Sequence, residues 1–415
     1  MKKKPIALAL AGVLTLSLVL CGCGRGKTES TDLTAGVAGN GPAYASAAEI
    51  PAADMTAMTD FGLALMKQSA GEKNVLISPA SILSALGMTA NGAKGETLAQ
   101  MEAVFGLSAE ELNAALSAAL PADDGVLSRA NAIWFNDREG LHIEESFLQA
   151  NADGCGAGVY SAPFDSNTCK EINRWVSEHT KGMIPSILDN VPEDAIMYLV
   201  NALAFDGEWL SPYDANCTTD GTFTKEDGTT RTVPFMHGDE YAYLAGEKVT
   251  GFLKDYKDSG YAFAALLPEE GISVTEALDS LTGESLTAML NNVSEEEVIT
   301  ALPKFTVDYD AGLELLLPAL GMTEAFDPVL ADFTGIGTSD LGNLYISRVL
   351  HKTHLSVDEL GTKAAAATVV EMTEGAVELE EPPKEVILDR PFIYMIVDRE
   401  SGLPVFMGTA MEIEG

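Results

Sequence analysis

The segment that most restricts how this chain can fold is Asp358–Val370, which reads DELGTKAAAATVV. Its four consecutive alanines favour helix, so a short surface helix is one interpretation. The β-branched residues that follow, Thr368 to Val370, favour a strand instead. In a strand, one face of the segment would carry no charge; that face comprises Thr362, Ala364, Ala366, Thr368 and Val370. A loop that stays in solvent does not need such a face, so we expect this segment to be able to enter a β-sheet.

The rest of the chain is first helical and then rich in strands. Helical spacing of apolar residues predicts helices over Met55–Gln68, Thr97–Phe105, Ser108–Leu120 and Thr168–Lys181. Ser108 and Glu111 form the pattern of a capping box. Short apolar runs predict buried strands over Ile196–Phe205, Ala262–Leu267, Val298–Leu302, Tyr345–Ile346 and Phe392–Val397. Because regular βαβ alternation is missing, the pattern predicts an α+β fold with large sheets and a helical cluster.

The first 22 residues are typical of a lipoprotein signal peptide. Three lysines precede an apolar run of 15 residues from Ile6 to Leu20. That run is shorter than the roughly 20 residues of a membrane-spanning helix and suits a signal peptide. The following Leu20-Cys21-Gly22-Cys23 resembles a bacterial lipobox, with Cys23 as the residue that carries the lipid. We expect an exported protein that is lipid-anchored at the extracellular face; an ordinary secretory signal is the alternative.

Residues 23–54 are rich in Gly, Ala, Ser and Thr and predict a flexible tether, with a folded domain over 55–415. A random coil of this length has a root-mean-square reach of roughly 30 Å. Three further cysteines, Cys155, Cys169 and Cys217, have no CxxC spacing. We expect them to be buried free thiols, and one disulfide remains possible.

Charge and motifs exclude several functions. Lys and Arg number 25 against 62 Asp and Glu, which gives a net charge of −37 and disfavours nucleic acid as a partner. Contact with a membrane is therefore expected only through the lipid. The chain lacks GxSxG, HExxH, Walker and EF-hand motifs. His351 and His354 would face opposite sides of a strand, which makes a shared metal improbable. We expect no cofactor, no metal and no enzymatic activity.

Several of these segments resemble motifs of one protein family. The stretch from Glu359 to Thr368 resembles the hinge of the serpins, Glu-x-Gly-Thr/Ser-x-Ala-Ala-x-Ala-Thr. In this chain the hinge residues are Glu359, Gly361, Thr362, Ala364, Ala365, Ala366, Ala367 and Thr368. Further serpin-like blocks occur in order: NVLISPASILSALGMTANGAKGET (74–97), YLVNALAFDGEW (198–209), LLPEEG (266–271), LPKF (302–305), RVLHKTHLSVDELGT (348–362) and PFIYMIVDRESGLPVFMG (391–408). The resemblance covers about 360 residues, from Met55 to the end.

The resemblance implies three β-sheets, eight or nine helices, and an exposed reactive-centre loop above a five-stranded sheet. It also implies a monomeric inhibitor that traps a serine protease covalently, as the cleaved loop inserts into the central sheet. Before insertion, Thr362 is expected near the surface. A non-inhibitory serpin with a binding or storage role is the alternative, and the uncharged hinge favours inhibition.

The resemblance also assigns individual residues. Ser78, Ser81, Asn201 and His351 match the shutter positions where the central strands part, and Trp209 matches the breach. The family spacing from Glu359 puts the reactive bond at Gly375–Ala376, with Ala376–Val377 as the alternative. No Lys or Arg lies between Ala364 and Pro383, so trypsin-like targets are not expected. Small residues around this bond suit elastase-like or subtilisin-like proteases, and nearby glutamates leave glutamyl-specific proteases as the second candidate.

Overall fold

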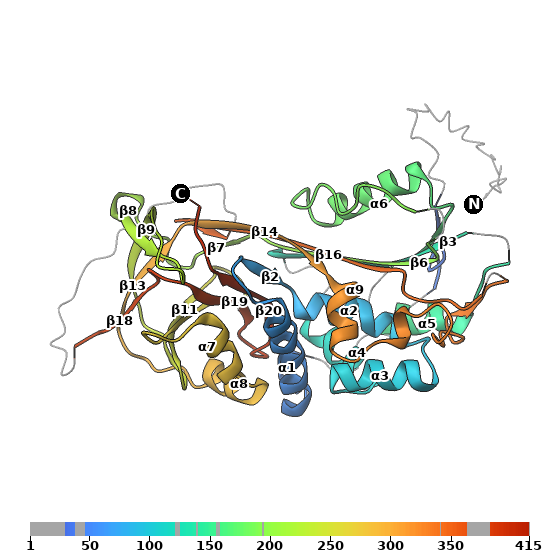
Figure 1. The fold of residues 1–415 in the computed structure, drawn as a ribbon, viewed down its shortest axis with the longest axis horizontal. Helices are drawn as coiled ribbons and strands as arrows, with labels where there is room; N and C mark the ends of the chain where they lie inside the picture. Colours follow the sequence, from blue (N-terminus) through green and yellow to red (C-terminus); the bar gives the residue numbers. More distant parts are fainter. Residues whose placement is uncertain are drawn as a thin grey trace, which may run out of the picture.

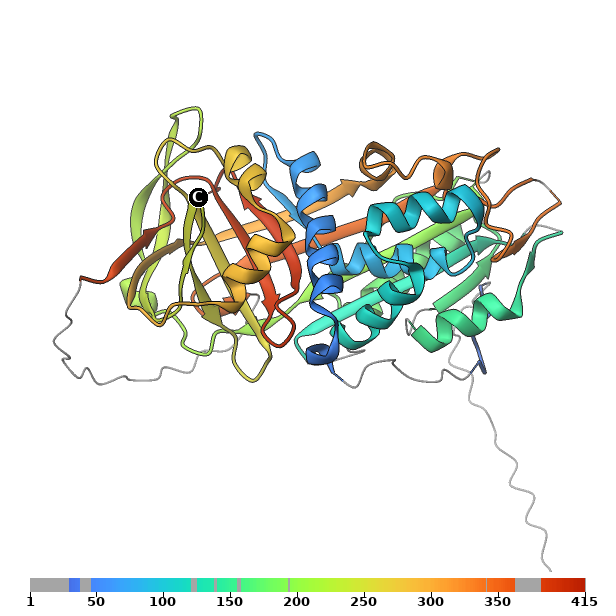
Figure 2. The ribbon, with the colours of Figure 1, turned by 90° about the horizontal axis from the view of Figure 1, so that it is seen from below.

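The helices of the chain lie on both sides of a large β-sheet (Figure 1), and Figure 2, seen from below, shows the blue N-terminal helices on its near side. A computed structural model describes residues 30–37, 46–120, 125–137, 140–154, 158–192, 195–340, 342–362 and 382–414. Its nine α-helices within these ranges are α1 (Ala52–Ser69), α2 (Pro79–Ala90), α3 (Gly95–Phe105), α4 (Ala109–Ala119), α5 (Glu145–Gly154), α6 (Ser166–His179), α7 (Val274–Ser280), α8 (Gly283–Asn291) and α9 (Leu313–Ala319). Three 3₁₀ turns are η1 (Ala47–Glu49), η2 (Ala215–Cys217) and η3 (Glu324–Phe326). Capping boxes begin α4, α6, α7 and α8, which satisfies backbone amides that a helix leaves unpaired at its start.

In the described ranges the large sheet has eight strands. In spatial order these are β1 (Thr31–Asp32), β5 (Gly158–Ala162), β3 (Leu127–Asn136), β6 (Met197–Phe205), β16 (Arg348–Val357), β17 (Gly361–Thr362) and β7 (Gly207–Glu208), and β14 (Phe305–Gly312) pairs with β16. The two central strands, β6 and β16, run parallel from Tyr198 opposite Arg348 to Ala204 opposite His354. The five-stranded sheet expected from the sequence is therefore extended by three strands of two residues each, β1, β7 and β17.

Two further sheets build the other half of the molecule. The six-stranded sheet contains β10 (Tyr243–Ala245), β11 (Val249–Asp255), β12 (Tyr261–Pro268), β19 (Phe392–Asp398), β20 (Pro404–Ala410) and β2 (Val75–Ile77). The four-stranded sheet contains β18 (Lys384–Ile387), β13 (Val298–Pro303), β9 (Thr230–Glu240) and β8 (Thr219–Thr224). A small ladder joins β15 (Gly337–Thr338) to β4 (His142–Ile143).

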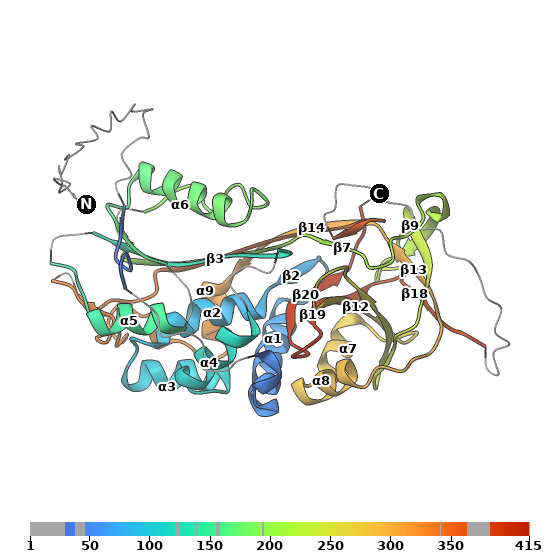
Figure 3. The same ribbon diagram turned by 180° about the vertical axis from the view of Figure 1, so that it is seen from behind.

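Both faces of the large sheet are covered. Figures 1 and 3 show α6 on one face of β3 and β6, and α2 with α3, α4 and α5 on the other. Trp134, Tyr198, Ile172 and Val176 are buried between α6 and the sheet. Since β6 lies between these two layers, all of its residues are buried, and its sequence MYLVNALAF is almost continuously apolar.

The helices and strands predicted from the sequence are confirmed, with one exception and some shifts at their ends. Tyr345–Ile346 is not a strand; the chain there is irregular, although Ile346 is buried. The range expected to be a tether is also partly structured, because Thr31–Asp32 forms β1 and α1 already begins at Ala52. Among the residues described, no helix is both long and apolar enough to span a bilayer.

Candidate functional site

The candidate site consists of two regions of the large sheet. One is the shutter, where β6 and β16 lie side by side, and the other is the hinge, where the chain leaves β16 through β17. Asn201 lies in the middle of β6 and is directly opposite His351 of β16. Ser78 and Ser81 reach them from the start of α2, which packs against β6 and β3.

The four shutter residues are buried and joined by hydrogen bonds. The Ser81 hydroxyl donates to Asn201 Oδ1 over 2.7 Å, and His351 Nδ1 lies 2.9 Å from the same oxygen. The amide of Asn201 donates to the carbonyl of Ser81 (2.5 Å) and to Asn131 Oδ1 (2.7 Å). The cluster therefore links both central strands to α2 and to β3.

The contacts of His351 determine its proton position. The backbone amide of Ser78 donates to His351 Nε2 over 3.1 Å, so this nitrogen is an acceptor and the ring proton is on Nδ1. Burial lowers the pKa of His351 to about 3, so the ring is neutral at physiological pH.

The shutter does not have the arrangement of a hydrolase. The Ser78 hydroxyl donates to the carbonyl of Val405 (2.7 Å), while the imidazole faces the Ser78 backbone. Because neither serine hydroxyl of this cluster is bonded to the imidazole, the cluster lacks a nucleophile activated by a base.

The hinge is fixed by hydrogen bonds to its backbone carbonyls. The backbone N–H of Trp209 donates to Leu360, and its indole N–H donates to Asp358, each over 2.9 Å. The N–H of Tyr213 donates to the carbonyl of Glu359, also over 2.9 Å. A side chain at Gly361 would place its Cβ 2.1 Å from the carbonyl oxygen of Gly207, so glycine is required there by close approach.

The carboxylate of Glu359 closes the hinge from the side. Lys304 donates to it over 2.7 Å and the Thr218 hydroxyl over 2.9 Å. Burial alone would raise the pKa of Glu359. The pKa is nevertheless lowered, because these two donors favour the ionised form. Lys304 belongs to the LPKF block noted in the sequence, where its partner could not be seen.

Thr362 corrects an expectation. It was expected near the surface before loop insertion, and it is instead fully buried in β17, between Val357 of β16 and Gly207 of β7. Its hydroxyl shares a hydrogen bond with the Tyr256 hydroxyl, 2.5 Å away. The first two residues that follow the turn after β16 are thus already part of the sheet.

Trp209, predicted at the breach, is buried below the hinge. Its ring stacks on Tyr256 with centroids 4.5 Å apart. Lys254 approaches both Trp209 and Tyr213, with its Nζ 4.2 Å from the Tyr213 centroid, and pairs with Glu240 over 2.5 Å. This pair, in which Lys254 is buried, was missed by sequence reasoning, although a lysine directly after the apolar residues of VTGFLKDY is a usable signal.

Other predicted residues lie elsewhere. Ala364–Thr368, the reactive-bond candidates Gly375, Ala376 and Val377, the lipidation candidate Cys23, and Cys155 fall outside the described residues. Cys169 is a buried free thiol, as expected, whereas the free Cys217 is exposed because it lies in the surface turn η2. In the parts of the chain that the structure describes, no three His, Cys, Asp or Glu side chains are grouped as metal ligands.

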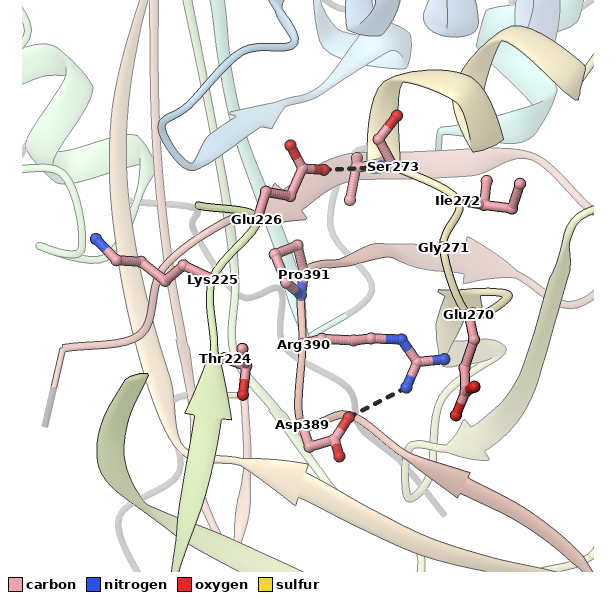
Figure 4. Close-up of a pocket in the computed structure, with 11 residues that line it drawn as sticks. Thr224, Lys225, Glu226, Glu270, Gly271, Ile272, Ser273, Asp389, Arg390 and Pro391 are labelled. Carbon is pink, nitrogen blue, oxygen red and sulfur yellow. Dashed lines mark hydrogen bonds and ion pairs between the residues drawn. The ribbon is translucent and has the colours of Figure 1, made fainter. Parts of the chain in front are cut away.

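A pocket of about 530 Å³ lies away from these two regions (Figure 4). It is lined by Thr224, Lys225, Glu226, Glu270, Gly271, Ile272, Ser273, Val274, Asp389, Arg390 and Pro391. Arg390 donates to Asp389 and to the carbonyl of Pro268, and Glu226 accepts from the amide of Val274. These polar groups are thus bonded partly to one another and partly to residues outside the pocket, and the pocket shares no residue with the shutter or hinge sets.

Comparison with known proteins agrees with this geometry. The profile of the family described as Serpin (serine protease inhibitor) matches residues 56–413. An uncharacterised serpin-like protein of Thermococcus kodakarensis is 34% identical over 371 residues, which cover 86% of this chain and 85% of the relative.

Two crystal structures of a thermophilic serpin, tengpin, are also similar. The native state is 40% identical with a TM-score of 0.86, over 93% of this chain and all of that one. The latent state is 42% identical with a TM-score of 0.75, over 87% of this chain and 98% of that one. The chain is thus more similar in structure to the native form than to the latent form.

Proposed function

The chain belongs to the serpin family, and we propose that it is an irreversible inhibitor of serine proteases. In this proposal a target protease cleaves the reactive loop and forms an acyl-enzyme. The cleaved loop then inserts between β6 and β16 as a new strand, a form of strand addition to a sheet. The displaced protease is held before it can deacylate.

The observation that carries the proposal is the position of β17. Gly361 and Thr362 pair antiparallel with β7 on one side, and Thr362 pairs antiparallel with β16 on the other. A strand that continues from Thr362 in the same direction would run between β6 and β16. Insertion would therefore extend a strand that has already started.

The strand directions favour such an extension. At present β6 and β16 form a parallel pair over seven registered positions. An inserted antiparallel strand would replace that single parallel ladder with two antiparallel ones, which are slightly more stable per residue and bring additional backbone hydrogen bonds.

The side chains of the loop fit this route. The Thr362 side chain is buried beneath the sheet, so alternate residues from Thr362 to Val370 would be buried with it in an inserted strand. None of the five is charged. Burial of an unpaired charge costs several kcal/mol, so this face supports insertion.

We further propose that the targets are elastase-like or subtilisin-like proteases. The loop between Ala364 and Pro383 offers small residues near Gly375–Ala376 and no Lys or Arg. Incubation with pancreatic elastase and with trypsin tests this, followed by denaturing gel electrophoresis and mass spectrometry of the released C-terminal peptide. A stable complex with elastase cleaved within 371–381 is expected; stoichiometric trapping of trypsin there would exclude this specificity.

The same experiment tests the inhibitory function. A serpin with a binding or storage role would be cleaved by elastase, or left intact, without a covalent complex. Absence of complex with elastase, subtilisin and a glutamyl-specific protease alike would contradict inhibition.

For localisation, we propose that the mature chain begins at a lipidated Cys23 and is held at the extracellular face of a membrane. The supporting feature is Leu20-Cys21-Gly22-Cys23 directly after the apolar run. Substitution of Cys23 is the direct test.

A further inference from the structure

The N-terminal segment is fixed to the folded domain much closer to Cys23 than composition suggests. The backbone amide of Ser30 donates to the buried Glu171 of α6 over 3.2 Å. Thr31 and Asp32 pair antiparallel with Ser161 and Tyr160 of β5. The amide of Leu33 then donates to the carbonyl of Val159 over 2.8 Å, and its half-buried side chain packs against the main core. Four consecutive residues are thus bonded to the domain.

This attachment lies at one end of the large sheet. Through β5 and β3, Thr31 and Asp32 are level with Met197 and Tyr198 at the start of β6. The hinge is level with the other end, since Gly361 pairs with Glu208. At about 3.3 Å per residue, ten residues of strand separate the two levels by about 33 Å. Figure 1 shows these two ends, with β3 and the β6 label towards one end of the molecule and β7 towards the other.

The chain between Cys23 and this attachment is short. Only residues 24–29 lie between Cys23 and Ser30. Even fully extended, the seven steps from Cys23 to Ser30 span at most about 25 Å. A lipid on Cys23 would therefore hold the β1 end of the sheet close to the bilayer surface.

We propose that β1 orients the domain on the membrane, with the β1 and α6 end facing the lipid and the hinge end facing away from it. This inference rests on the lipid anchor proposed above. The reactive loop, which starts at Thr362, is then presented to soluble proteases arriving from the medium, and not to proteases held close to the bilayer.

Charge supports the same arrangement. The segment GRGKTES (24–30) carries Arg25 and Lys27 against one acid, Glu29, and the two cations lie next to the lipidated residue, where basic side chains are attracted to anionic headgroups. The chain as a whole has a net charge of −37, so its folded body is repelled by the same headgroups. These opposite preferences favour residues 24–30 at the surface and the folded body extended away from it.

The test is energy transfer from two single fluorophores to a headgroup-labelled lipid in vesicles that carry the full lipidated protein. One donor is attached to the exposed Cys217, which lies beside the hinge because Thr218 bonds to Glu359. The other is attached through Asn167→Cys, an exposed position at the start of α6, in a Cys217→Ser background. All proteins also carry Cys155→Ser, and the buried Cys169 is left in place.

We expect several-fold higher transfer from position 167 than from position 217. Leu33→Pro removes the amide that bonds to Val159 and the side chain that packs on the core. It should make the two transfer efficiencies converge, whereas the matched Ala35→Pro, at an exposed position two residues further on, should preserve the difference.

Equal transfer from both positions in the vesicle-bound protein would overturn the orientation. Failure of the protein to float with vesicles would refute the lipid anchor instead. In that case the same donor pair is measured with a histidine tag in place of residues 1–23, so that no free thiol is added at Cys23, on vesicles that contain a nickel-chelating lipid. Equal transfer there would overturn the role of β1 independently of lipidation.

Discussion

The buried position of Thr362 makes Thr362→Arg the most informative substitution. In the uncleaved protein an arginine at this position would have to share the space now filled by the Thr362 and Tyr256 hydroxyls. Burial of a guanidinium without a partner costs several kcal/mol even after relaxation. If β17 withdraws from the sheet, the backbone hydrogen bonds of two paired residues and one side-chain hydrogen bond are lost. Each such hydrogen bond is worth about 1 kcal/mol net. Withdrawal is therefore the cheaper response.

The uncleaved variant should thus stay folded, with β17 detached and Tm lower by a few degrees. Loop insertion cannot avoid the cost of burying the guanidinium, because position 362 must enter the sheet before the following residues can enter. A barrier raised by several kcal/mol slows insertion at least 100-fold, since each 1.4 kcal/mol is tenfold in rate. The protease should then deacylate first, and the variant should be cleaved at the same bond without a covalent complex.

Thr362→Val is the matched control. It leaves the Tyr256 hydroxyl without its partner, at a cost of about 1–3 kcal/mol, so its loss of stability should be similar. It introduces no charge, so it should still trap elastase on a denaturing gel. If Thr362→Arg traps as efficiently as the wild type, insertion is not the mechanism; if Thr362→Val also fails, loss of stability explains both variants and the argument from buried charge is wrong.

Three further predictions concern the shutter, the breach and the anchor. Because burial keeps the pKa of His351 near 3 while an unfolded histidine titrates near 6.5, protons bind the unfolded chain preferentially between these values. The free energy of unfolding should fall as pH drops from about 6.5 towards 3, and His351→Gln should flatten that dependence in urea titrations; an unchanged slope would assign it to other groups. Lys254→Met should cost about 3–5 kcal/mol because the Glu240 side chain, only 13% exposed, is left without its cation, and Lys254→Met with Glu240→Gln should recover most of this loss; additive losses in the same titrations would refute the coupling. Cys23→Ala should abolish membrane association and preserve inhibition, and its continued fractionation with membranes would rule out the lipidated cysteine.

Much of the architecture could be predicted because it depends on long periodic segments. The continuous apolar run of β6 and the stripe of α1 each repeat their signal over many residues. The shutter residues could be named because they occur within motifs. Their bonds also depend only on common chemistry: hydroxyl, amide and imidazole satisfy one another when buried.

What could not be predicted depends on two-residue contacts or on partners distant in sequence. β1 and β17 each contain two residues, too few to show any periodicity, and both act through pairing with other strands. The exposure of Cys217 follows from its place in a surface turn, which composition does not reveal. Thr362 was misplaced for the same reason, because its burial depends on Tyr256, 106 residues away in the chain.

The hinge contacts determine which face of the loop would be buried when the loop enters the sheet. A strand that enters a sheet one residue out of register turns every side chain to the opposite face. For this chain such a slip would bury Lys363 where Thr362 now lies. The bonds from Trp209 and Tyr213 to the carbonyls at 358–360 fix the chain before β17, and the contact between Gly361 and Gly207 leaves no room to shift it. Register is therefore set before the loop is cleaved, and the alternate residues beyond Thr362 need only follow it.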